Sequence, residues 1–349
     1  MSDTDLIRTA RELVAPGKGI LAADESTGTM NKRLTAVNVP ADEERRRSFR
    51  ELVVTTPGLG RWISGVILYD ETFRQSARDG SLLPAAAVRN GVPPGIKVDT
   101  GAKPQAGTDG ETVTEGLDGL RDRLAEYVSM GARFAKWRAV IRIGEGKPSH
   151  ACLSANAHAL ARYAALCQEA GLVPMVEPEV LMDGAHGIER CSEVTEQCLR
   201  VVFDELRSQG VLLEGIVLKP NMVVSGEECP EQADVDAVAD ATLACLRRVV
   251  PAAVPGIAFL SGGQSDEAAT AHLDRMNRRT RQPWELTFSY GRALLAPALS
   301  TWAGDDWNVE AAQQVLAHRA RCNAAARSGE YTPDMEKELA ERVPAAGQH

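Results

Sequence analysis

VPMVEPEV (residues 173–180) and EGIVLKPNM (residues 214–222) are two short apolar runs of the kind that form buried β-strands. A helical stripe lies between them, and Gly210 follows the stripe as a helix stop. This part of the chain therefore reads as a strand, a helix and a second strand. The stripe keeps the i, i+3, i+4, i+7 spacing through Cys191, Val194, Cys198, Val201 and Val202.

Six further apolar runs continue this alternation in both directions, and each interval between runs has room for one helix and its loops. Eight alternations without a break in composition predict a (β/α)8 TIM barrel of the α/β class. An open doubly wound sheet is the alternative, but it more often has fewer strands or a second domain. The six runs are GILAADE (19–25), GVILYDE (65–71), GIKVDT (95–100), RFAKWR (133–138), GIAFLSGG (256–263) and ELTFSYGRAL (285–294).

The domain organisation is expected to be simple. No linker rich in Gly, Pro or Ser divides residues 1–349, so we expect a single barrel domain. Flanking helices are predicted before the first strand, over residues 5–14, and after the last, over residues 308–327. Residues 100–111 are expected to form a long polar loop. The polar, Ala-rich residues 333–349 predict a loosely held C-terminal tail.

Composition excludes several classes of function. The net charge of -9 and the absence of a Lys/Arg block argue against binding to nucleic acid. No stretch approaches the roughly 18 apolar residues of a membrane span, and the N-terminus lacks the pattern of a signal peptide, so we expect a cytoplasmic protein. Seven scattered cysteines without a Cys-x-x-Cys pair predict reduced thiols, and six histidines without metal-ligand spacing predict no metal site.

The polar residues at the strand ends are the candidates for chemistry, because reactive groups of such barrels lie at the carboxyl ends of the strands. A charged side chain inside a strand is costly unless it is paired or functional. The candidates read from the eight runs are Asp24, Lys97, Lys136, Arg138, Glu177, Glu179, Lys219, Ser261, Gly262, Gly263, Ser289, Gly291 and Arg292.

Lys219 has the surroundings that a nucleophilic amine needs. It follows an apolar triplet (216–218) and precedes Pro220, so its amine is expected in apolar surroundings near Lys136. Desolvation and a second cation both lower the pKa of a lysine, which favours the neutral amine required for a Schiff base. Glu177 is expected to protonate the hydroxyl that leaves the carbinolamine and then to move protons on the substrate.

Strands seven and eight carry the pattern of a phosphate site. Ser-Gly-Gly-Gln (261–264) leads into a helix, so its backbone N–H groups could bind an anion, and the Gly291-Arg292 pair adds a permanent cation. The mouth is expected to carry a local positive excess, which suits a substrate with one or two phosphates. That excess comes from Lys97, Lys136, Arg138, Lys219 and Arg292 against Asp24, Glu177 and Glu179.

Each of these residues also has a structural interpretation. A single lysine on a strand is more often an ion-pair partner than a nucleophile, although three lysines with three acidic residues favour a functional site. Gly262, Gly263 and Gly291 could be turn glycines, and Asp24 could be the N-cap of the helix after the first strand. The residues alone do not choose among the three lysines.

The chain resembles the class I fructose-bisphosphate aldolases, a family of barrel enzymes that work without a metal or cofactor. The resemblance runs through nearly the whole chain and implies a phosphorylated sugar substrate, fructose 1,6-bisphosphate, which is cleaved reversibly to dihydroxyacetone phosphate and glyceraldehyde 3-phosphate. It also implies a cytosolic, glycolytic homotetramer. The matching segments are GKGILAADESTG, GVILYDETF, GIKVDTG, GTDGETVTEGLDGL, FAKWR, VEPE, LKPNM, FLSGGQS and LTFSYGRAL.

The resemblance implies a role for each motif residue. Lys219 of LKPNM would form the imine, Glu177 of VEPE would be the principal acid and base with Glu179 close by, and Lys136 and Asp24 would assist. One phosphate would lie on Ser261, Gly262, Gly291 and Arg292. The other would lie near Lys97, Arg138, Ser26, Thr29 and Arg33.

One family feature is absent, and two other functions remain open. Animal members end in a tyrosine implicated in proton transfer at the enamine carbon, whereas the last tyrosine here is Tyr331. We expect another group or water to take that step. A related barrel lyase would keep Lys219 and Glu177 but need not have two phosphate clusters. A sugar-phosphate-binding protein without activity would keep only the barrel.

Overall fold

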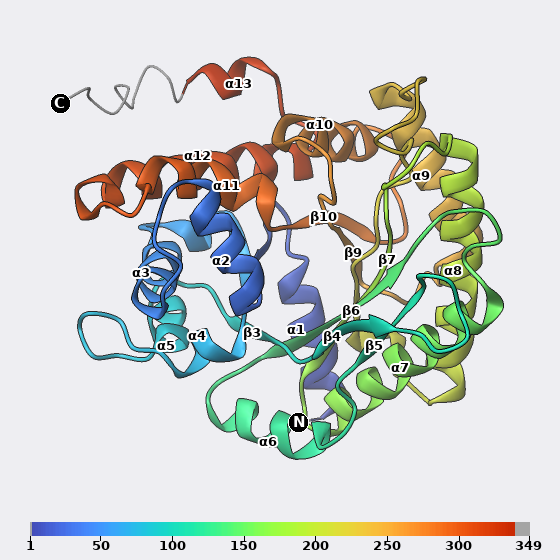
Figure 1. The fold of residues 1–349 in the computed structure, drawn as a ribbon, viewed down its shortest axis with the longest axis horizontal. Coiled ribbons are helices and arrows are strands. Elements are labelled where there is room, and N and C mark those ends of the chain that lie inside the picture. The colour runs from blue at the N-terminus through green and yellow to red at the C-terminus, as the bar shows by residue number, and fades with distance from the viewer. Residues whose placement is uncertain (1, 339–349) are drawn as a thin grey trace.

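Eight parallel strands form a closed barrel, in the order β1-β10-β9-β8-β7-β6-β3-β2 (Figure 1). The structure is a computed structural model that describes residues 2–338. The predicted (β/α)8 barrel is confirmed. Its strands are β1 (Gly19–Ala23), β2 (Ile63–Leu68), β3 (Pro94–Lys97), β6 (Phe134–Ile141), β7 (Val173–Val180), β8 (Val217–Leu218), β9 (Gly256–Phe259) and β10 (Glu285–Tyr290).

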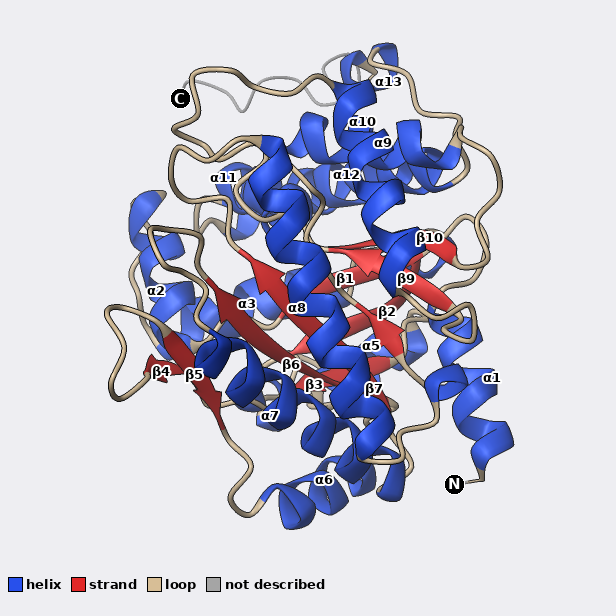
Figure 2. Cartoon of the chain, turned by 90° about the vertical axis from the view of Figure 1, so that its right-hand side faces the viewer, coloured by secondary structure: helices blue, strands red, loops and turns tan. Residues whose placement is uncertain are grey.

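Helices surround the barrel strands (Figure 2). Several begin at side-chain caps that satisfy their free N–H groups, such as Ser149 before α7 and Asp234 before α9. The α-helices are α1 (Asp3–Leu13), α2 (Thr27–Ala36), α3 (Glu43–Val54), α4 (Asp70–Arg74), α5 (Leu83–Arg89), α6 (Leu120–Ser129), α7 (His150–Glu169), α8 (Ile188–Ser208), α9 (Val235–Val249), α10 (Asp266–Asn277), α11 (Arg292–Trp302), α12 (Val309–Arg327) and α13 (Asp334–Lys337). Short 3-10 turns are η1 (Leu59–Arg61), η2 (Leu213–Gly215) and η3 (Asp306–Asn308).

The predicted strands all overlap observed ones, but their carboxyl ends were placed too late in several cases. Residues 70–71 already belong to α4, and residues 292–294 belong to α11 rather than to the last strand. The sixth predicted strand shrinks to the two residues of β8. Only the run at 173–180 coincides with its strand, β7, over its full length. Both flanking helices are present as α1 and α12.

Three connections differ from the simple repeat. The first and second intervals each hold two helices, α2 with α3 and α4 with α5. The prediction of a loop over residues 100–111 was wrong in part, because β4 (Gly101–Pro104) pairs antiparallel with β5 (Thr112–Glu115). This hairpin leaves the barrel directly after β3. Its residues are mostly exposed and polar, so apolar periodicity does not reveal it.

The inside of the barrel changes character along its length. Towards the amino ends of the strands, Ile20, Phe134 and Val217 form one apolar cluster with Leu6 and with other residues of α1 and the barrel. Further along the strands, the same inward side carries polar groups such as Lys136 and Lys219, two residues past Phe134 and Val217, because side chains alternate with a period of two. Helix α1 thus closes the amino end, and the charged layer lies at the open carboxyl end.

The described part of the C-terminal region is attached to the barrel helices. Residues 334–337 form α13, and Glu336 accepts hydrogen bonds from Arg319 and from the Tyr331 hydroxyl. The remainder of the predicted tail, residues 339–349, lies outside the described residues. None of the helices described over residues 2–338 has the length and apolar character needed to span a bilayer.

We expect Gly95→Ala to destabilise the protein. Gly95 pairs with Phe134 in the adjacent strand, and a Cβ at Gly95 would lie 2.4 Å from ring atoms of Phe134. Overpacking of this kind costs about 1–3 kcal/mol in the free energy of unfolding, which a denaturant titration measures. Gly28→Ala is the matched control, because no atom lies within 4 Å of its Cβ position. Equal stabilities of the two variants would contradict the packing described here.

Candidate active site

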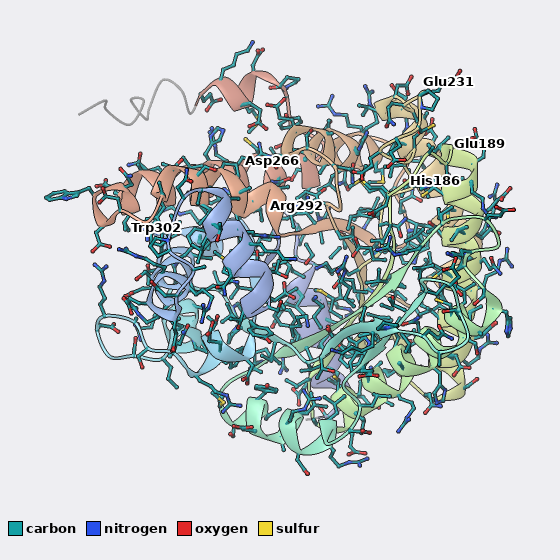
Figure 3. All side chains as sticks on the ribbon, viewed as in Figure 1. His186, Glu189, Glu231, Asp266, Arg292 and Trp302 are labelled. Carbon is teal, nitrogen blue, oxygen red and sulfur yellow. The ribbon has the colours of Figure 1, made fainter. Side chains whose placement is uncertain are left out.

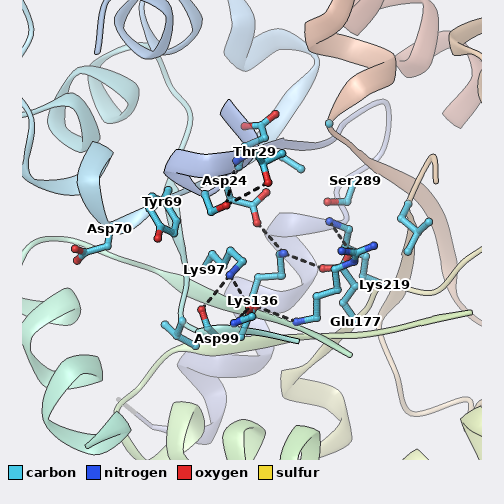
Figure 4. Close-up of a pocket in the computed structure, with 18 of the residues that line it drawn as sticks. Asp24, Thr29, Tyr69, Asp70, Lys97, Asp99, Lys136, Glu177, Lys219 and Ser289 are labelled. Atoms are coloured by element: carbon cyan, nitrogen blue, oxygen red, sulfur yellow. Dashed lines mark hydrogen bonds and ion pairs between the residues drawn. The ribbon is translucent and has the colours of Figure 1, made fainter. Parts of the chain in front are cut away.

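A cavity of about 740 Å³ opens at the carboxyl ends of the barrel strands. Figure 4 shows its central residues. Every predicted site residue except Gly263 lines it. A Cβ at Gly263 would instead meet the Met182 sulfur at 2.7 Å, so this glycine lies against Met182 and not on the cavity wall. The lining predicted residues are Asp24, Ser26, Thr29, Arg33, Lys97, Lys136, Arg138, Glu177, Glu179, Lys219, Ser261, Gly262, Ser289, Gly291 and Arg292.

Four buried charged side chains form the central ion cluster, defined as Asp24, Lys136, Glu177 and Lys219. The Lys136 Nζ lies 2.7 Å from Asp24 Oδ2 and 3.1 Å from Glu177 Oε2. The Lys219 Nζ lies 3.3 Å from Glu177 Oε1. Each side chain is buried, and Figure 4 shows the four lying together in the pocket. Glu177 therefore bridges the two lysines.

The register of the strands brings these residues together. Arg138 on β6 lies beside Glu177 on β7, and Lys97 on β3 lies beside Lys136 on β6. The Lys219 N–H donates to the Val176 carbonyl at 2.8 Å, which continues the pairing past the end of β8. Lys219 thus sits at the height of Glu177 in the barrel.

The ion pairs set the protonation of the cluster. Burial alone would raise the pKa of Asp24, but the ammonium groups of Lys136 and Lys219 hold it well below its usual range. Glu177 follows the same pattern, since Lys136 and Lys219 outweigh its burial and lower its pKa. Burial would lower the pKa of Lys136, but Asp24 and Glu177 raise it well above its usual range. Glu177 is consequently a carboxylate in the free protein. The expected role as a proton donor therefore requires that it first accept a proton.

The three lysines now differ in their contacts. Lys136 is held between two carboxylates and stays protonated. Lys97 donates both to the Asp99 carboxylate and to the Asp99 carbonyl. Lys219 pairs with one carboxylate, that of Glu177. Lys136 therefore has two carboxylate partners, whereas Lys97 and Lys219 have one each.

One anion-binding region is formed by the ends of β9 and β10. Gly291 precedes the first turn of α11, whose free N–H groups favour a negative charge. Gly262 has a positive φ of 55°, a conformation that favours glycine. The exposed Arg292 guanidinium donates to the Gly262 carbonyl, and within residues 2–338 it forms no ion pair. Its charge is therefore available to a ligand, and Figure 3 shows Arg292 near Asp266 at the top of the barrel.

Two side chains that were not predicted as site residues, Gln264 and His272, support this region. The Gln264 side-chain amide donates to the Ser261 carbonyl at 3.2 Å, and its oxygen lies 2.6 Å from His272 Nδ1. Burial lowers the pKa of His272 to about 4, so the ring is neutral at pH 7 and can donate to Gln264. The adjacent Gln in SGGQS was the available signal for this contact.

The second anion-binding region lies near β1, β3 and β6, and its cations are already paired. Arg33 pairs with Glu25, Arg138 with Glu179, and Lys97 with Asp99. The alternative of Asp24 as a helix cap was wrong. Ser26 is the N-cap of α2 and accepts from the Thr29 N–H at 3.4 Å, while Asp24 pairs with Lys136.

The excess of positive over negative charge at the cavity is smaller than the sequence suggested. Eight lysines and arginines and seven aspartates and glutamates line the cavity. Asp99 was missed although it lies two residues past Lys97, on the same side of the chain. Glu25 and the buried Arg50, which pair at 2.6 Å, come from separate elements, and no local pattern links them.

Other residue types are excluded from the described cavity wall. No histidine or cysteine lines the cavity in the part of the chain that the structure describes. Tyr331, the last tyrosine, is buried beside Glu336 and is not a lining residue.

Comparisons with known proteins agree with this geometry. The sequence profile described as fructose-bisphosphate aldolase class-I matches residues 5–345. A probable fructose-bisphosphate aldolase class 1 of Xanthomonas axonopodis pv. citri is 57% identical, over 95% of this chain and 99% of the relative. The Dictyostelium discoideum fructose-bisphosphate aldolase is 53% identical, over 94% of this chain and 93% of its own.

Solved structures give the same result. A fructose-bisphosphate aldolase from Plasmodium falciparum superposes with a TM-score of 0.93 at 48% identity, over 94% of this chain and 95% of that one. The two chains therefore share the barrel fold over nearly their whole length. The chain belongs to the class I fructose-bisphosphate aldolases.

Proposed function

We propose that this class I fructose-bisphosphate aldolase, a lyase, cleaves fructose 1,6-bisphosphate through an imine on Lys219. One observation carries the assignment: Glu177 lies between Lys219, at 3.3 Å, and Lys136, at 3.1 Å. Lys136 is held protonated by two carboxylates and cannot act as the nucleophile. Lys219 can transfer its proton to Glu177 and attack the substrate ketone.

Glu177 first accepts and then donates a proton during imine formation. Its Oε1 takes the proton of the Lys219 ammonium, and the neutral amine adds to the ketone carbon. The resulting carboxylic acid protonates the carbinolamine hydroxyl, which leaves as water and gives the iminium ion. The cationic Lys136 stabilises negative charge on the carbinolamine oxygen. Asp24 stays ionised and keeps Lys136 in place.

The same carboxylate can serve the cleavage step. Glu177 Oε2 is buried and lies 3.1 Å from the Lys136 Nζ, which orients the carboxylate towards a substrate hydroxyl. It takes the proton of the C4 hydroxyl as the C3–C4 bond breaks, and the electron pair moves to the iminium nitrogen. Glyceraldehyde 3-phosphate leaves. The protonated Glu177 then returns the proton to the enamine carbon, and water releases dihydroxyacetone phosphate from Lys219.

Two anion-binding regions flank the central ion cluster and suit the two phosphates of the substrate. We assign one phosphate to the region of Ser261, Gly262, Gly291 and Arg292. The other is assigned to Lys97, Arg138, Ser26, Thr29 and Arg33, whose cations would exchange a carboxylate partner for phosphate. Ser289 lies on β10 between the two regions.

The cellular setting and assembly are also part of the proposal. A relative in Arabidopsis thaliana, 50% identical over 95% of this chain and 85% of its own, is named a cytosolic fructose-bisphosphate aldolase. The name of this relative supports a cytoplasmic enzyme. A single domain and a homotetramer stay predictions, the latter from the family resemblance alone.

Borohydride reduction in the presence of dihydroxyacetone phosphate should leave a covalent adduct on Lys219. Peptide mapping by mass spectrometry locates it. Lys219→Arg should abolish the adduct, because the guanidinium stays protonated. Lys97→Arg is the control and should retain it. An adduct on Lys136, or no adduct in an active preparation, would sink the assignment, and a protein that only binds sugar phosphates would give none.

Glu177→Gln should lower kcat by about 100- to 10,000-fold, because the amide keeps the shape of the side chain but cannot exchange protons. Steady-state cleavage of fructose 1,6-bisphosphate measures the effect. Glu179→Gln is the matched control. Its partner Arg138 lies in the second anion-binding region, so this change should act mainly on KM. A Glu177→Gln enzyme within tenfold of the native kcat would contradict the proton route.

Arg292→Ala should weaken phosphate binding by about 10- to 100-fold, the effect of losing a charge-assisted hydrogen bond. Competitive inhibition by inorganic phosphate gives the affinity directly. Arg74→Ala serves for comparison, since Arg74 also lines the cavity but is paired with Asp70 and Glu126. Similar losses in both variants would show that the effect is general electrostatics and not binding at Arg292.

A further inference from the structure

Three potential metal ligands meet between α12 and α13, away from the active-site cavity. His318 and Cys322 lie one turn apart on α12, and Glu336 comes from α13. One donor atom of each lies within 4.8 Å of the other two. None of the three lines the active-site cavity. We propose that His318, Cys322 and Glu336 form a zinc site that fastens α13 to α12.

The distances fit a tetrahedral ion. His318 Nε2 lies 3.5 Å from Cys322 Sγ and 3.7 Å from Glu336 Oε2. Tetrahedral zinc, with Zn–S of about 2.3 Å and Zn–N or Zn–O of about 2.0–2.1 Å, places N and S about 3.5 Å apart and N and O about 3.4 Å apart. These two separations are therefore near their bound values, and the Cys322 Sγ lies within 4.8 Å of a Glu336 oxygen.

The ligand types select the ion. A thiolate, an imidazole and one carboxylate match the borderline-soft Zn²⁺, whereas Ca²⁺ and Mg²⁺ prefer oxygen ligands. Three protein ligands leave a fourth position for water. Cys322 and His318 are buried, and Glu336 is partly exposed, which gives water a route to that position.

Neighbouring groups already orient the carboxylate. Arg319 and the Tyr331 hydroxyl both donate to Glu336 Oε1, the latter at 3.1 Å. The other oxygen, Oε2, is the one that faces His318. Outer hydrogen bonds of this kind fix a ligand's position and are a common part of metal sites.

The expectation of no metal site rested on the spacing of the histidines among themselves. His318 and Cys322 are four residues apart, which puts them on one helix face. A search for histidine pairs and for Cys-x-x-Cys overlooks such a mixed pair. Glu336 is brought to it by the turn after α12, at Gly329, and no sequence spacing shows that contact.

Cobalt provides the test, because tetrahedral Co²⁺ with a thiolate ligand absorbs in the visible and shows thiolate-to-metal charge transfer in the near ultraviolet. The full-length protein, reduced and stripped with chelator, should bind one Co²⁺ per chain with both features. Zn²⁺ should displace it, following the order of metal affinities. Ligation releases the thiol proton, so the apparent affinity should rise with pH.

The variants assign the ligands. Cys322→Ser, His318→Gln and Glu336→Gln should each weaken Co²⁺ binding at least tenfold, and Cys322→Ser should remove the charge-transfer band. Tyr331→Phe should weaken binding by about tenfold through loss of an outer hydrogen bond. Cys229→Ser is the control and should bind as the native protein does, because Cys229 lies outside the cluster. Circular dichroism confirms that each variant is folded.

Zinc should also raise the melting temperature of the stripped native protein by a few degrees, but not that of Cys322→Ser. The stripped protein should still form the borohydride-trapped adduct on Lys219. Absence of the cobalt bands in the native protein, or unchanged bands in Cys322→Ser, would overturn the site. Loss of imine trapping on stripping would overturn its structural role.

Discussion

The ion bridge at Lys136 is the interaction on which the barrel mouth depends. Without the ammonium group, Asp24 would lose its ion-pair partner and Glu177 would keep only Lys219, a costly arrangement in a low-dielectric interior. With it, both carboxylates stay ionised and Glu177 is held beside Lys219. One lysine therefore fixes the charge state of a base and leaves the other lysine free for chemistry. The two residues have the same side chain and different functions because their neighbours differ.

Near neutrality is the second property of the mouth. Phosphate-binding cations in a buried cavity would repel one another strongly in the absence of substrate. Here Glu25, Glu179 and Asp99 each hold one of them. These carboxylates stabilise the empty cavity, and under the proposed assignment they would be displaced or shared when phosphate binds. Arg292, at the exposed edge, needs no such partner because water screens its charge.

The barrel could be predicted from the sequence because apolar periodicity is local, and so could the side on which each strand residue points. Lys136 and Arg138 lie on one side of their strand, as Glu177 and Glu179 do on theirs. This follows from the strand period alone. The pairing of Asp24 with Lys136, or of Glu25 with Arg50, joins segments far apart in the chain and depends on barrel closure. The hairpin after β3 was missed because it buries little apolar surface. The carboxyl ends of several strands were misplaced because the next helix begins directly after the strand.

The closure of the barrel by α1 has a consequence for the order of events. Because the apolar layer under the charged mouth blocks the other end, substrate and both products share a single opening. In the proposed mechanism, a covalent bond to Lys219 would hold the three-carbon ketone fragment deep in this blind channel while the aldehyde fragment departs. Product release is therefore ordered. The fragment nearer the entrance has to leave before the covalently bound fragment can be hydrolysed and released.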